Sequence, residues 1–358
     1  MATVYIGTYT QREDHVDGKG AGIYCCRYDA TTGALTVRSV EPGIVNPSYL
    51  AIDAAQRRLY AVSEVLASAG GPTGAIHAYA IDPVTEQLTF LNRQYTGGGA
   101  PCYVSISEAH VLVANYAGGS VAVFPIQADG SLGAATDFVQ HEGSSVNAAR
   151  QEAPHPHCII LDPEGRYAHV PDLGIDCVVS YAFDAERGRL QAGPGCVRAR
   201  SGAGPRHLVF DADGTYAYLI SELDATVTVF AYAASTGVLA PVETLDAQPE
   251  GYDGVRSGAD IHLTPDGRFL YASLRGTGSI VGYAVDAETG SLTNRHYAST
   301  HGKTPRNFAI DPTGQFLVAA NQDSDTLVTF RIDRNTGALS DPVHIADVPS
   351  PVCVAFPE

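Results

Sequence analysis

The residues of this chain that best fit a chemical task are one histidine, three arginines and two glutamates at equivalent positions of an internal repeat: His157, Arg206, Arg275, Arg306, Glu64 and Glu222. Histidine and glutamate can act as general base or acid. An arginine guanidinium can bind a carboxylate or phosphate through two parallel hydrogen bonds and can stabilise an oxyanion. The set therefore suits a carbonyl substrate that carries negative charge.

One stretch of the chain indicates how such residues come together. SGAGPRHLVFDADGTYAYLISELDATVTVF has three short runs rich in Tyr, Val, Ile, Leu and Phe, which turn sequences separate. These runs predict three strands: Arg206–Phe210, Tyr216–Ser221 and Thr226–Phe230. Adjacent strands joined by a tight turn run antiparallel, so the start of the first lies beside the end of the second. We therefore expect Arg206 and Glu222, sixteen positions apart, to meet at one edge of the sheet.

The same pattern recurs along the chain. Seven segments resemble the start of the first strand: NPSYLAI, APCYVSI, HPHCIIL, GPRHLVF, GADIHLT, TPRNFAI and SPVCVAF. Successive copies are 46 to 55 residues apart, and most continue into a turn such as DPEG or DADG and then into further strands. About four strands per copy, repeated seven times, predict an all-β protein, a seven-bladed β-propeller. A two-sheet sandwich does not explain so regular a period.

The two ends of the chain complete one repeat. VYIGTYT near the start matches a second strand, and SPVCVAFPE at the end matches a first strand. We expect these strands to pair and close one blade, which would leave no free sheet edge between the ends. No linker interrupts the pattern, so residues 1–358 are predicted to form one domain. Three loops are longer than the repeat requires: Val65–Gly74, Gln140–Pro154 and Gln248–Ser257.

Because the copies are in register, equivalent positions can be compared directly. The residues after the repeat's proline (a glycine in one copy) form a first set: Ser48, Cys102, His157, Arg206, Ala259, Arg306 and Val352. The residues that end the second strand form a second set: Glu64, Tyr116, Leu173, Glu222, Arg275, Gln322 and Tyr9. Hairpin geometry places both sets at one rim, at the mouth of the central channel. The residue types at these positions diverge between copies, which indicates a site more than a packing role.

Charged residues at a rim also have an ordinary structural interpretation. We expect a rim to be solvated, and charged residues at the ends of strands are common there. An exposed ion pair contributes only about 0–1 kcal/mol to stability. If the rim carries the chemistry, changes at Arg206 and Glu222 should therefore reduce activity and leave stability nearly unchanged.

The overall charge limits the partners. With a formal net charge of −17 and a pI near 5.0, the surface repels nucleic acid and anionic membranes. The chain has no apolar run of membrane length and opens with a strand-like sequence, so we expect neither a membrane span nor a signal peptide. The seven cysteines are scattered, without a CxxC pair. They predict buried, reduced thiols in a cytoplasmic protein.

Other motifs are weaker candidates for a site. His155 and His157 have a spacing that could hold a metal, but no acidic or cysteine partner is fixed nearby. The pattern Gly276-x-Gly278-x-x-x-Gly282 resembles a nucleotide loop without the helix that should follow it. The acidic turns lack the ligand pattern of a calcium loop, and no G-x-S-x-G nucleophile motif occurs. The sequence therefore predicts no metal and no cofactor.

Three segments resemble a known enzyme family: SGAGPRHLVFDADGTYAYLISEL, ADIHLTPDGRFLYASLR and TPRNFAIDPTGQFLVAANQ. They look like the bacterial cycloisomerase-type 6-phosphogluconolactonases, a lactonase family that also includes the fungal 3-carboxy-cis,cis-muconate lactonizing enzyme and sugar-acid lactonases. The resemblance implies a seven-bladed propeller whose active-site residues are His157, Arg206, Glu222 and Arg275. It leaves His155 as a possible substitute for His157, and this sequence has no obvious extra cluster of Lys or Arg for a phosphate.

The resemblance implies hydrolysis of a sugar-acid lactone, with 6-phospho-D-glucono-1,5-lactone as the first expectation. Glu222 or His157 would activate water, and Arg206 and Arg275 would stabilise the oxyanion. The expected substrate-binding residues are Arg306, Glu64, His155, Gln322 and Tyr116. Three alternatives remain: an unphosphorylated aldonic or aldaric lactonase, a muconate-type cycloisomerase, and a non-catalytic propeller that binds other proteins. The expected partner is a small lactone, and the expected state is a monomer or a weak homo-oligomer.

Overall fold

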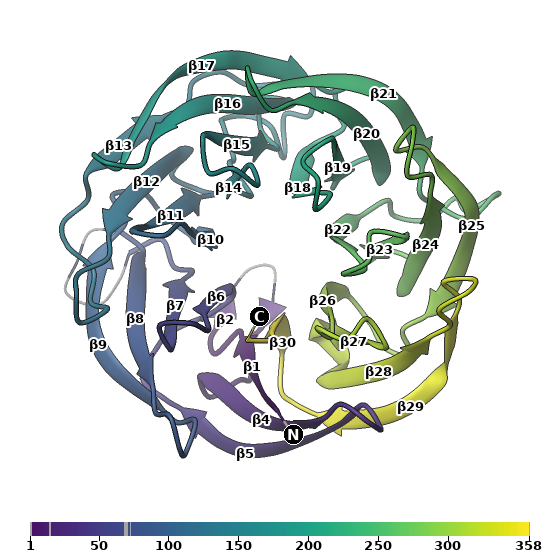
Figure 1. Cartoon of the computed structure of the whole chain (residues 1–358), viewed down its shortest axis with the longest axis horizontal. Coiled ribbons are helices and arrows are strands. Elements are labelled where there is room, and N and C mark those ends of the chain that lie inside the picture. The colour runs from purple at the N-terminus through teal and green to yellow at the C-terminus, as the bar shows by residue number, and fades with distance from the viewer. Residues whose placement is uncertain (1, 14–15, 68–70, 72, 358) are drawn as a thin grey trace. The chain divides into compact units, whose positions relative to one another are not determined.

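The computed structural model describes residues 2–13, 16–67, 71 and 73–357, so part of the predicted loop Val65–Gly74 lies outside the described residues. Within these residues the secondary structure consists of thirty β-strands and one 3₁₀ helix, Gln322–Ser324. The strands form seven sheets of four strands and one two-stranded ribbon. The all-β, seven-bladed β-propeller predicted from the repeat is confirmed (Figure 1).

The chain falls into two compact units. The first comprises Met1–Pro47, Tyr218–Val229 and Pro241–Glu358, and the second comprises Ser48–Ala217 and Phe230–Ala240. One sheet contributes residues to both units; its strands, in order, are β18 (Pro205–Phe210), β19 (Tyr216–Ser221), β20 (Thr226–Ala233) and β21 (Val238–Asp246). The prediction that residues 1–358 form one domain stays a prediction.

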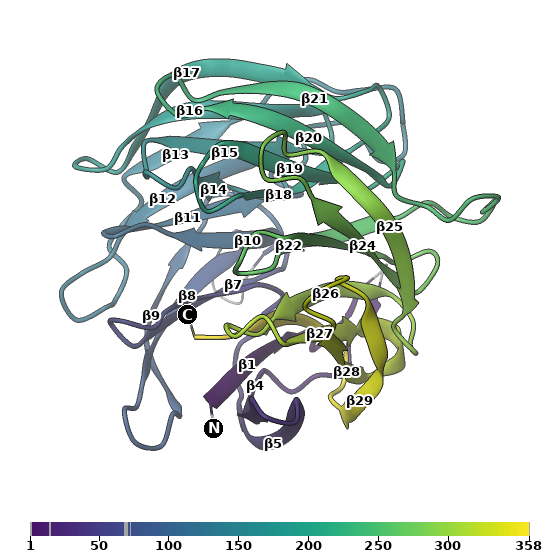
Figure 2. The same cartoon turned by 45° about the vertical axis from the view of Figure 1, so that its right-hand side comes forward.

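The first unit holds three complete sheets and the ribbon. One sheet has the order β30 (Pro351–Ala355), β1 (Ala2–Thr8), β4 (Ile23–Asp29) and β5 (Ala34–Glu41). The next has β22 (Gly258–Leu263), β23 (Phe269–Leu274), β24 (Ser279–Val285) and β25 (Leu292–Ser299). The third, whose strands lie side by side in Figure 2, has β26 (Pro305–Ile310), β27 (Phe316–Asn321), β28 (Thr326–Ile332) and β29 (Leu339–Asp347). The ribbon pairs β2 (Arg12–Glu13) with β3 (Val16–Asp17).

The second unit also holds three complete sheets. The first has the order β6 (Leu50–Asp53), β7 (Arg58–Ser63), β8 (Ala75–Ile81) and β9 (Leu88–Tyr95). The second has β10 (Pro101–Ile106), β11 (His110–Asn115), β12 (Ser120–Pro125) and β13 (Asp137–Gln140). The third has β14 (Ile160–Leu161), β15 (Tyr167–Asp172), β16 (Cys177–Asp184) and β17 (Arg189–Arg198).

The sheet that joins the two chain ends forms as the sequence predicts. β30 pairs antiparallel with β1, and the paired residues run from Tyr5 opposite Ala355 to Thr8 opposite Pro351. On its other side β1 pairs with β4. The C-terminal strand therefore supplies the first strand of a blade whose other three strands come from the N-terminal part of the chain.

The turns between first and second strands explain why these segments fold locally into hairpins. In DPEG, DADG and DPTG the aspartate Oδ1 accepts two backbone N–H groups just beyond the turn, which fixes the start of the second strand. The glycine of each turn has a φ between +62° and +67°, where other residues are strained. This turn chemistry sets the hairpin register, and the register fixes which residues reach the strand ends.

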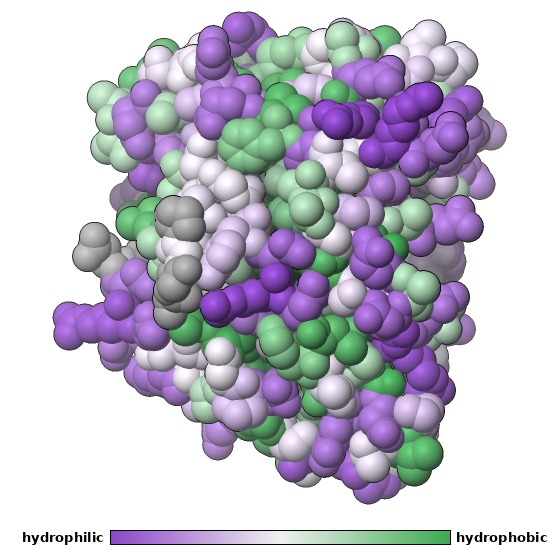
Figure 3. Space-filling view, turned by 90° about the vertical axis from the view of Figure 1, so that its left-hand side faces the viewer, coloured by the Kyte–Doolittle hydropathy of each residue, from purple (hydrophilic) through white to green (hydrophobic). Residues whose placement is uncertain are grey.

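Apolar faces hold neighbouring sheets together inside each unit. In the second unit, Tyr60 of β7 lies in one buried cluster with Val113 of β11 and Phe124 of β12. In the first unit, Phe308 of β26 packs with Tyr271 of β23. Burial of one such side chain is worth about 1.5–3 kcal/mol, so the sheet faces stabilise the fold and leave the strand ends for polar residues. On the face drawn in Figure 3, hydrophilic residues alternate with small apolar groups.

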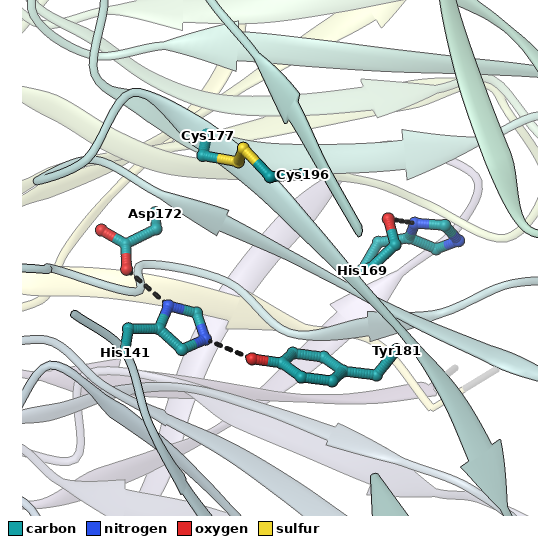
Figure 4. The surroundings of a disulfide bond; sticks show 7 residues. His141, His169, Asp172, Cys177, Tyr181 and Cys196 are labelled. Atoms are coloured by element: carbon teal, nitrogen blue, oxygen red, sulfur yellow. Dashed lines mark hydrogen bonds and ion pairs between the residues drawn. A yellow bond between two sulfur atoms is a disulfide. The ribbon is translucent and has the colours of Figure 1, made fainter. Parts of the chain in front are cut away.

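The prediction for the cysteines is partly wrong. Five buried cysteines form no disulfide, as expected: Cys25, Cys26, Cys102, Cys158 and Cys353. Cys177 and Cys196, however, form a disulfide between β16 and β17 (Figure 4). The pairing of these two strands brings the Cα atoms to 5.9 Å, within the usual range for a disulfide. This closeness depends on a strand register with an irregularity between Ser180 and Tyr181, which spacing in the sequence does not reveal.

The disulfide changes the expected result of a thiol titration. We expect five reactive thiols in the denatured, unreduced protein and seven after reduction, with few in the native protein because the cysteines outside the disulfide are buried. Replacing Cys177 and Cys196 together with serine should lower the free energy of unfolding by about 3 kcal/mol, the chain-entropy value for a loop of similar length. Titration of seven thiols before reduction would contradict the disulfide.

Candidate active site

The residues of the second set occupy one structural position. Each directly follows the last residue of the second strand of its sheet, as Glu222 follows β19, Arg275 follows β23 and Tyr116 follows β11. In the first set, five members are the second residue of a first strand: Cys102, Arg206, Ala259, Arg306 and Val352. Ser48 and His157 lie shortly before β6 and β14. The sequence therefore located both sets correctly relative to the strands.

A repeated hydrogen bond joins the two sets within a sheet. The backbone N–H of the second-set residue donates to the carbonyl oxygen of the residue two positions before the first-set residue, at 2.8–3.1 Å. Within the described residues, examples of this bond are Tyr116 to Ala100, Leu173 to His155, Arg275 to Ser257, Gln322 to Thr304 and Tyr9 to Ser350. In these sheets the start of the first strand and the end of the second lie together, as the hairpin argument predicted.

Two residues of the second set form an ion pair in the first unit. Arg275 Nη2 lies 2.9 Å from Glu222 Oε2, and the two side chains are only 15% and 5% exposed. Arg275 also donates to the carbonyl oxygen of Gly258. A carboxylate and a guanidinium are thus held together with little access to water, where electrostatic interactions are stronger than at an open surface.

Gly258 explains why one repeat copy has glycine where the others have proline. Its backbone N–H donates to the carbonyl oxygen of Glu222 at 3.0 Å, and proline has no N–H to donate. A Cβ at this position would lie 2.4 Å from the carbonyl oxygen of Ser221. The close approach of β22 to the end of β19 therefore requires glycine, and it fixes the backbone that carries Glu222.

Arg206 lies in the second unit and is 2% exposed. Its Nη1 lies 3.3 Å from His207 Nε2. Because a guanidinium only donates hydrogen bonds, His207 Nε2 accepts, and the neutral imidazole then carries its proton on Nδ1. The arginine is therefore oriented by the neighbour that follows it in the chain.

His207 is a buried residue that the sequence analysis missed. Its ring centroid lies 5.2 Å from that of His157 and 5.1 Å from that of Tyr103, so it connects Arg206 with His157. The signal was present in the position after the first set, where the copies carry Tyr49, Tyr103, Cys158, His207, Asp260, Asn307 and Cys353. A comparison of the residues at this position across the seven copies would have singled out His207, the one histidine among them.

The two histidines of the HPHC segment differ in their contacts. His155 uses both ring nitrogens: Nδ1 donates to the carbonyl oxygen of Tyr116 at 2.9 Å, and Nε2 lies 3.2 Å from Glu152 Oε1. His157 is 4% exposed, its Nδ1 lies 3.7 Å from Cys102 Sγ, and its ring contacts Tyr116 edge-on. Both ring nitrogens of His155 are thus engaged, and His157 is the better candidate for acid–base chemistry.

The remaining predicted residues have contacts or burial that can be described within their own units. Tyr116 stacks on His155 with ring centroids 4.5 Å apart, and its hydroxyl accepts a hydrogen bond from Arg150. In the first unit, the Arg306 guanidinium lies 5.4 Å from the centre of the Tyr9 ring. Gln322 is buried and donates to Asp323, whereas Glu64 of the second unit is half-buried at the end of β7.

The expectation of a solvated rim is wrong for the central residues. His157, Arg206 and Glu222 are each at most 4% exposed. Hairpin geometry predicts where a strand ends, but not which distant segments cover that end. Changes at these positions will therefore affect stability as well as activity, since a buried polar group left without a partner costs about 1–3 kcal/mol.

No group of three or more His, Cys, Asp or Glu side chains within 2–13, 16–67, 71 and 73–357 is arranged to hold a metal ion. None of the described helices is long and apolar enough to cross a membrane.

Comparison with known proteins identifies a family. The family described as "Lactonase, 7-bladed beta-propeller" matches residues 3–356. A 6-phosphogluconolactonase of Bacillus subtilis (strain 168) is 37% identical over 313 residues, which cover 86% of this chain and 84% of that protein. A 6-phosphogluconolactonase of Formosa agariphila is 34% identical and covers 86% of each chain. The solved structure of the periplasmic gluconolactonase of Pseudomonas aeruginosa is 36% identical, with a TM-score of 0.92 over 99% of this chain and 98% of that one.

These similarities extend over nearly the whole propeller. The family match begins in β1 and ends one residue after β30, so it includes the blade that joins the chain ends. It also spans every member of the two sets. The chain belongs to the lactonase family of seven-bladed β-propellers.

Proposed function

We propose that this protein hydrolyses 6-phospho-D-glucono-1,5-lactone to 6-phosphogluconate. The observation that carries the proposal is the buried ion pair of Glu222 and Arg275 at second-set positions. Burial of charged groups is costly, and groups kept in that state are frequently functional. The names of the Bacillus subtilis and Formosa agariphila relatives support the phosphorylated substrate.

In the proposed mechanism a water molecule attacks the lactone carbonyl. Glu222 or His157 accepts the proton that the water loses, and a C–O bond forms as the carbonyl oxygen becomes an oxyanion. Arg206 and Arg275 donate hydrogen bonds to that oxyanion. When the tetrahedral intermediate collapses, the ring C–O bond breaks and the leaving oxygen takes back a proton. The new carboxylic acid group then releases its proton to the solvent, so the product is one open chain that carries a carboxylate and a hydroxyl group.

The anionic part of the substrate requires local positive charge, because the chain has a formal net charge of −17. We propose Arg306 as an anion-binding residue, with Glu64, His155, Gln322 and Tyr116 as further substrate contacts. A guanidinium suits this role because its planar donors match phosphate geometry. The protein is proposed to use neither a metal nor another cofactor, and to act on a small lactone as a monomer or weak homo-oligomer.

We propose a cytoplasmic location, which the five buried cysteines outside the disulfide support. The Cys177–Cys196 disulfide favours an oxidising compartment instead, because reducing conditions open most disulfides. The thiol titration described above, made on protein trapped by alkylation inside the cell, separates the two locations.

An unphosphorylated sugar-acid lactone is the second candidate substrate, since the Pseudomonas aeruginosa relative is named a gluconolactonase. A pH-stat assay of purified protein against both lactones, with and without a chelator, tests the choice. We expect a kcat/KM for the phosphorylated lactone at least tenfold above that for glucono-1,5-lactone, unchanged by the chelator. A higher value for the unphosphorylated lactone would favour the second candidate, and no rate above spontaneous hydrolysis for either would refute the proposal.

A further inference from the structure

The turn between β15 and β16 carries two buried aspartates whose hydrogen bonds reach other segments of the chain. Asp172 ends β15 and Asp176 precedes β16, and they are 0% and 3% exposed. Buried carboxylates are costly unless their oxygens are hydrogen-bonded, so the partners of these oxygens reveal what the turn holds.

Asp172 holds the segment that leads to His157. Its Oδ1 accepts the backbone N–H of His155 at 2.7 Å and that of Gly174 at 3.0 Å. Its Oδ2 lies 2.6 Å from His141 Nδ1, and His141 Nε2 lies 2.9 Å from the Tyr181 hydroxyl (Figure 4). The His157 N–H donates to the carbonyl oxygen of Pro171, so the histidine segment is tied to the end of β15 at two backbone positions.

Asp176 holds the segment that leads to Arg206 in the same way. Its Oδ2 accepts the backbone N–H of Gly202 at 2.6 Å, and its Oδ1 accepts that of Gly204 at 2.8 Å. The other two contacts come from the predicted long loop Gln140–Pro154, from the Ser145 hydroxyl and the Gln151 amide. Gly204 stands two positions before Arg206, just as His155 stands two positions before His157.

We infer that Asp172 and Asp176 are positioning residues for the reaction proposed above, which fix the His157 and Arg206 segments to one short turn. The expected effect on the rate rests on the proposed function, whereas the hydrogen bonds of the two aspartates do not depend on it. We call each of these aspartates a clamp, because its carboxylate accepts backbone N–H groups of the segment that leads to a first-set residue. A displacement of about 1 Å in a catalytic group can reduce a rate 10²-fold, so the two clamps matter to the chemistry. Cys177 directly follows the turn, and its disulfide with Cys196 limits the movement of the turn.

A purely structural role is the alternative, and the chain contains a matched case of it. Asp325 has a φ of +58°, close to the +51° of Asp176. Its Oδ1 accepts the backbone N–H of Ser350 at 2.9 Å, and its Oδ2 pairs with Lys19. Ser350 stands two positions before Val352, a first-set residue without acid–base or charged chemistry. Asp325 therefore provides the same clamp at a place where no catalytic group is held.

The partners of the two aspartates predict different responses to asparagine. All four groups around the Asp176 carboxylate are donors, and two of them are backbone N–H groups that cannot reverse. In Asp176→Asn the asparagine NH₂ must therefore face the backbone N–H of Gly202 or Gly204, and two donors cannot form a hydrogen bond with each other. At Asp172 one partner is His141, which can move its proton to Nε2 and accept from the asparagine. Burial raises the pKa of Tyr181 to about 12, so its neutral hydroxyl can accept that proton's hydrogen bond.

Kinetics of three variants test the inference. We expect Asp176→Asn to lower kcat about 10- to 100-fold with KM nearly unchanged, and Asp172→Asn to lower kcat by a smaller factor, because His141 can accept a hydrogen bond from the asparagine. Asp325→Asn should lower the melting temperature without changing kcat per folded molecule. Equal kcat values for Asp176→Asn and Asp325→Asn, after correction for the folded fraction, would overturn the positioning role.

Amide hydrogen exchange gives a readout that does not depend on activity. In Asp176→Asn we expect the Gly202 or Gly204 amide to exchange at least tenfold faster, with the Ser350 amide unchanged; Asp325→Asn should give the opposite pattern. Unchanged protection of Gly202 and Gly204 in Asp176→Asn would refute the clamp even if the enzyme is active. If the wild type lacks lactonase activity but these exchange patterns appear, the proposed function fails and the clamp stands.

Discussion

Replacing Glu222 with glutamine should lower kcat/KM for the phosphorylated lactone by about 10²–10³. The change removes a proton acceptor while it preserves the shape of the side chain, and general base catalysis is worth factors of this size. It also removes the charge that faces Arg275 at 2.9 Å. Because both side chains are largely buried, we expect the free energy of unfolding to fall as well, by about 1–3 kcal/mol.

A matched control separates the two effects. Glu164 forms an ion pair with Arg166 at an exposed position, with side chains 58% and 48% exposed. Glu164→Gln should leave both activity and stability nearly unchanged, since exposed pairs contribute about 0–1 kcal/mol. Melting curves and rates measured on the same preparations give activity per folded molecule. Wild-type turnover per folded molecule in Glu222→Gln would exclude Glu222 from the chemistry.

Arg206→Lys should lower kcat/KM by about 10²–10³ through a different cause. Lysine keeps the positive charge but lacks the planar fork of donors, and loss of one oxyanion donor costs a rate factor of this order. The contact between Arg206 Nη1 and His207 Nε2 is lost at the same time. The sequence alone predicts that this variant keeps its stability, because it places Arg206 at a solvated rim. In the structure Arg206 is 2% exposed, so we expect the free energy of unfolding to fall.

Arg256 offers the control for this substitution. Its guanidinium binds Asp246 through two hydrogen bonds of 2.9 and 2.8 Å, and its side chain is 38% exposed. Arg256→Lys also loses a two-point contact with an anion, but at a position outside the proposed site. We expect its kcat/KM to stay within about twofold of the wild type. A similar loss in both variants would show that the arginine fork matters for folding and not for catalysis.

The parts of the fold set by local chemistry could be predicted. The strands expected at Arg206–Phe210 and Tyr216–Ser221 begin and end within one residue of β18 and β19, because alternating apolar residues and Asp-x-x-Gly turns act over short distances. The strand expected at Thr226–Phe230 ends three residues before β20 does. The closing pair of β30 and β1 was predictable because each end carries a recognisable half of the repeat. The positions of the two sets followed from the same hairpin register.

Features that depend on contacts between distant segments could not be predicted. The burial of Arg206 and the role of His207 depend on which loops and rings cover the strand ends, and periodicity carries no information on this. The disulfide between Cys177 and Cys196 depends on the register of β16 and β17. The clamps of Asp172 and Asp176 join segments 17 to 28 residues away in the sequence, a separation over which local turn chemistry does not act.

The most direct test of the proposed chemistry follows one oxygen atom. Hydrolysis of 6-phospho-D-glucono-1,5-lactone in ¹⁸O-labelled water, followed by mass spectrometry, measures how fast labelled oxygen enters the product carboxylate. The proposal predicts one labelled oxygen per product, formed by the wild type far faster than by the buffer, and at a rate about 10²–10³ lower with Glu222→Gln. An equal rate with Glu222→Gln would assign the base to His157, and incorporation at the uncatalysed rate with the wild type would contradict the proposal.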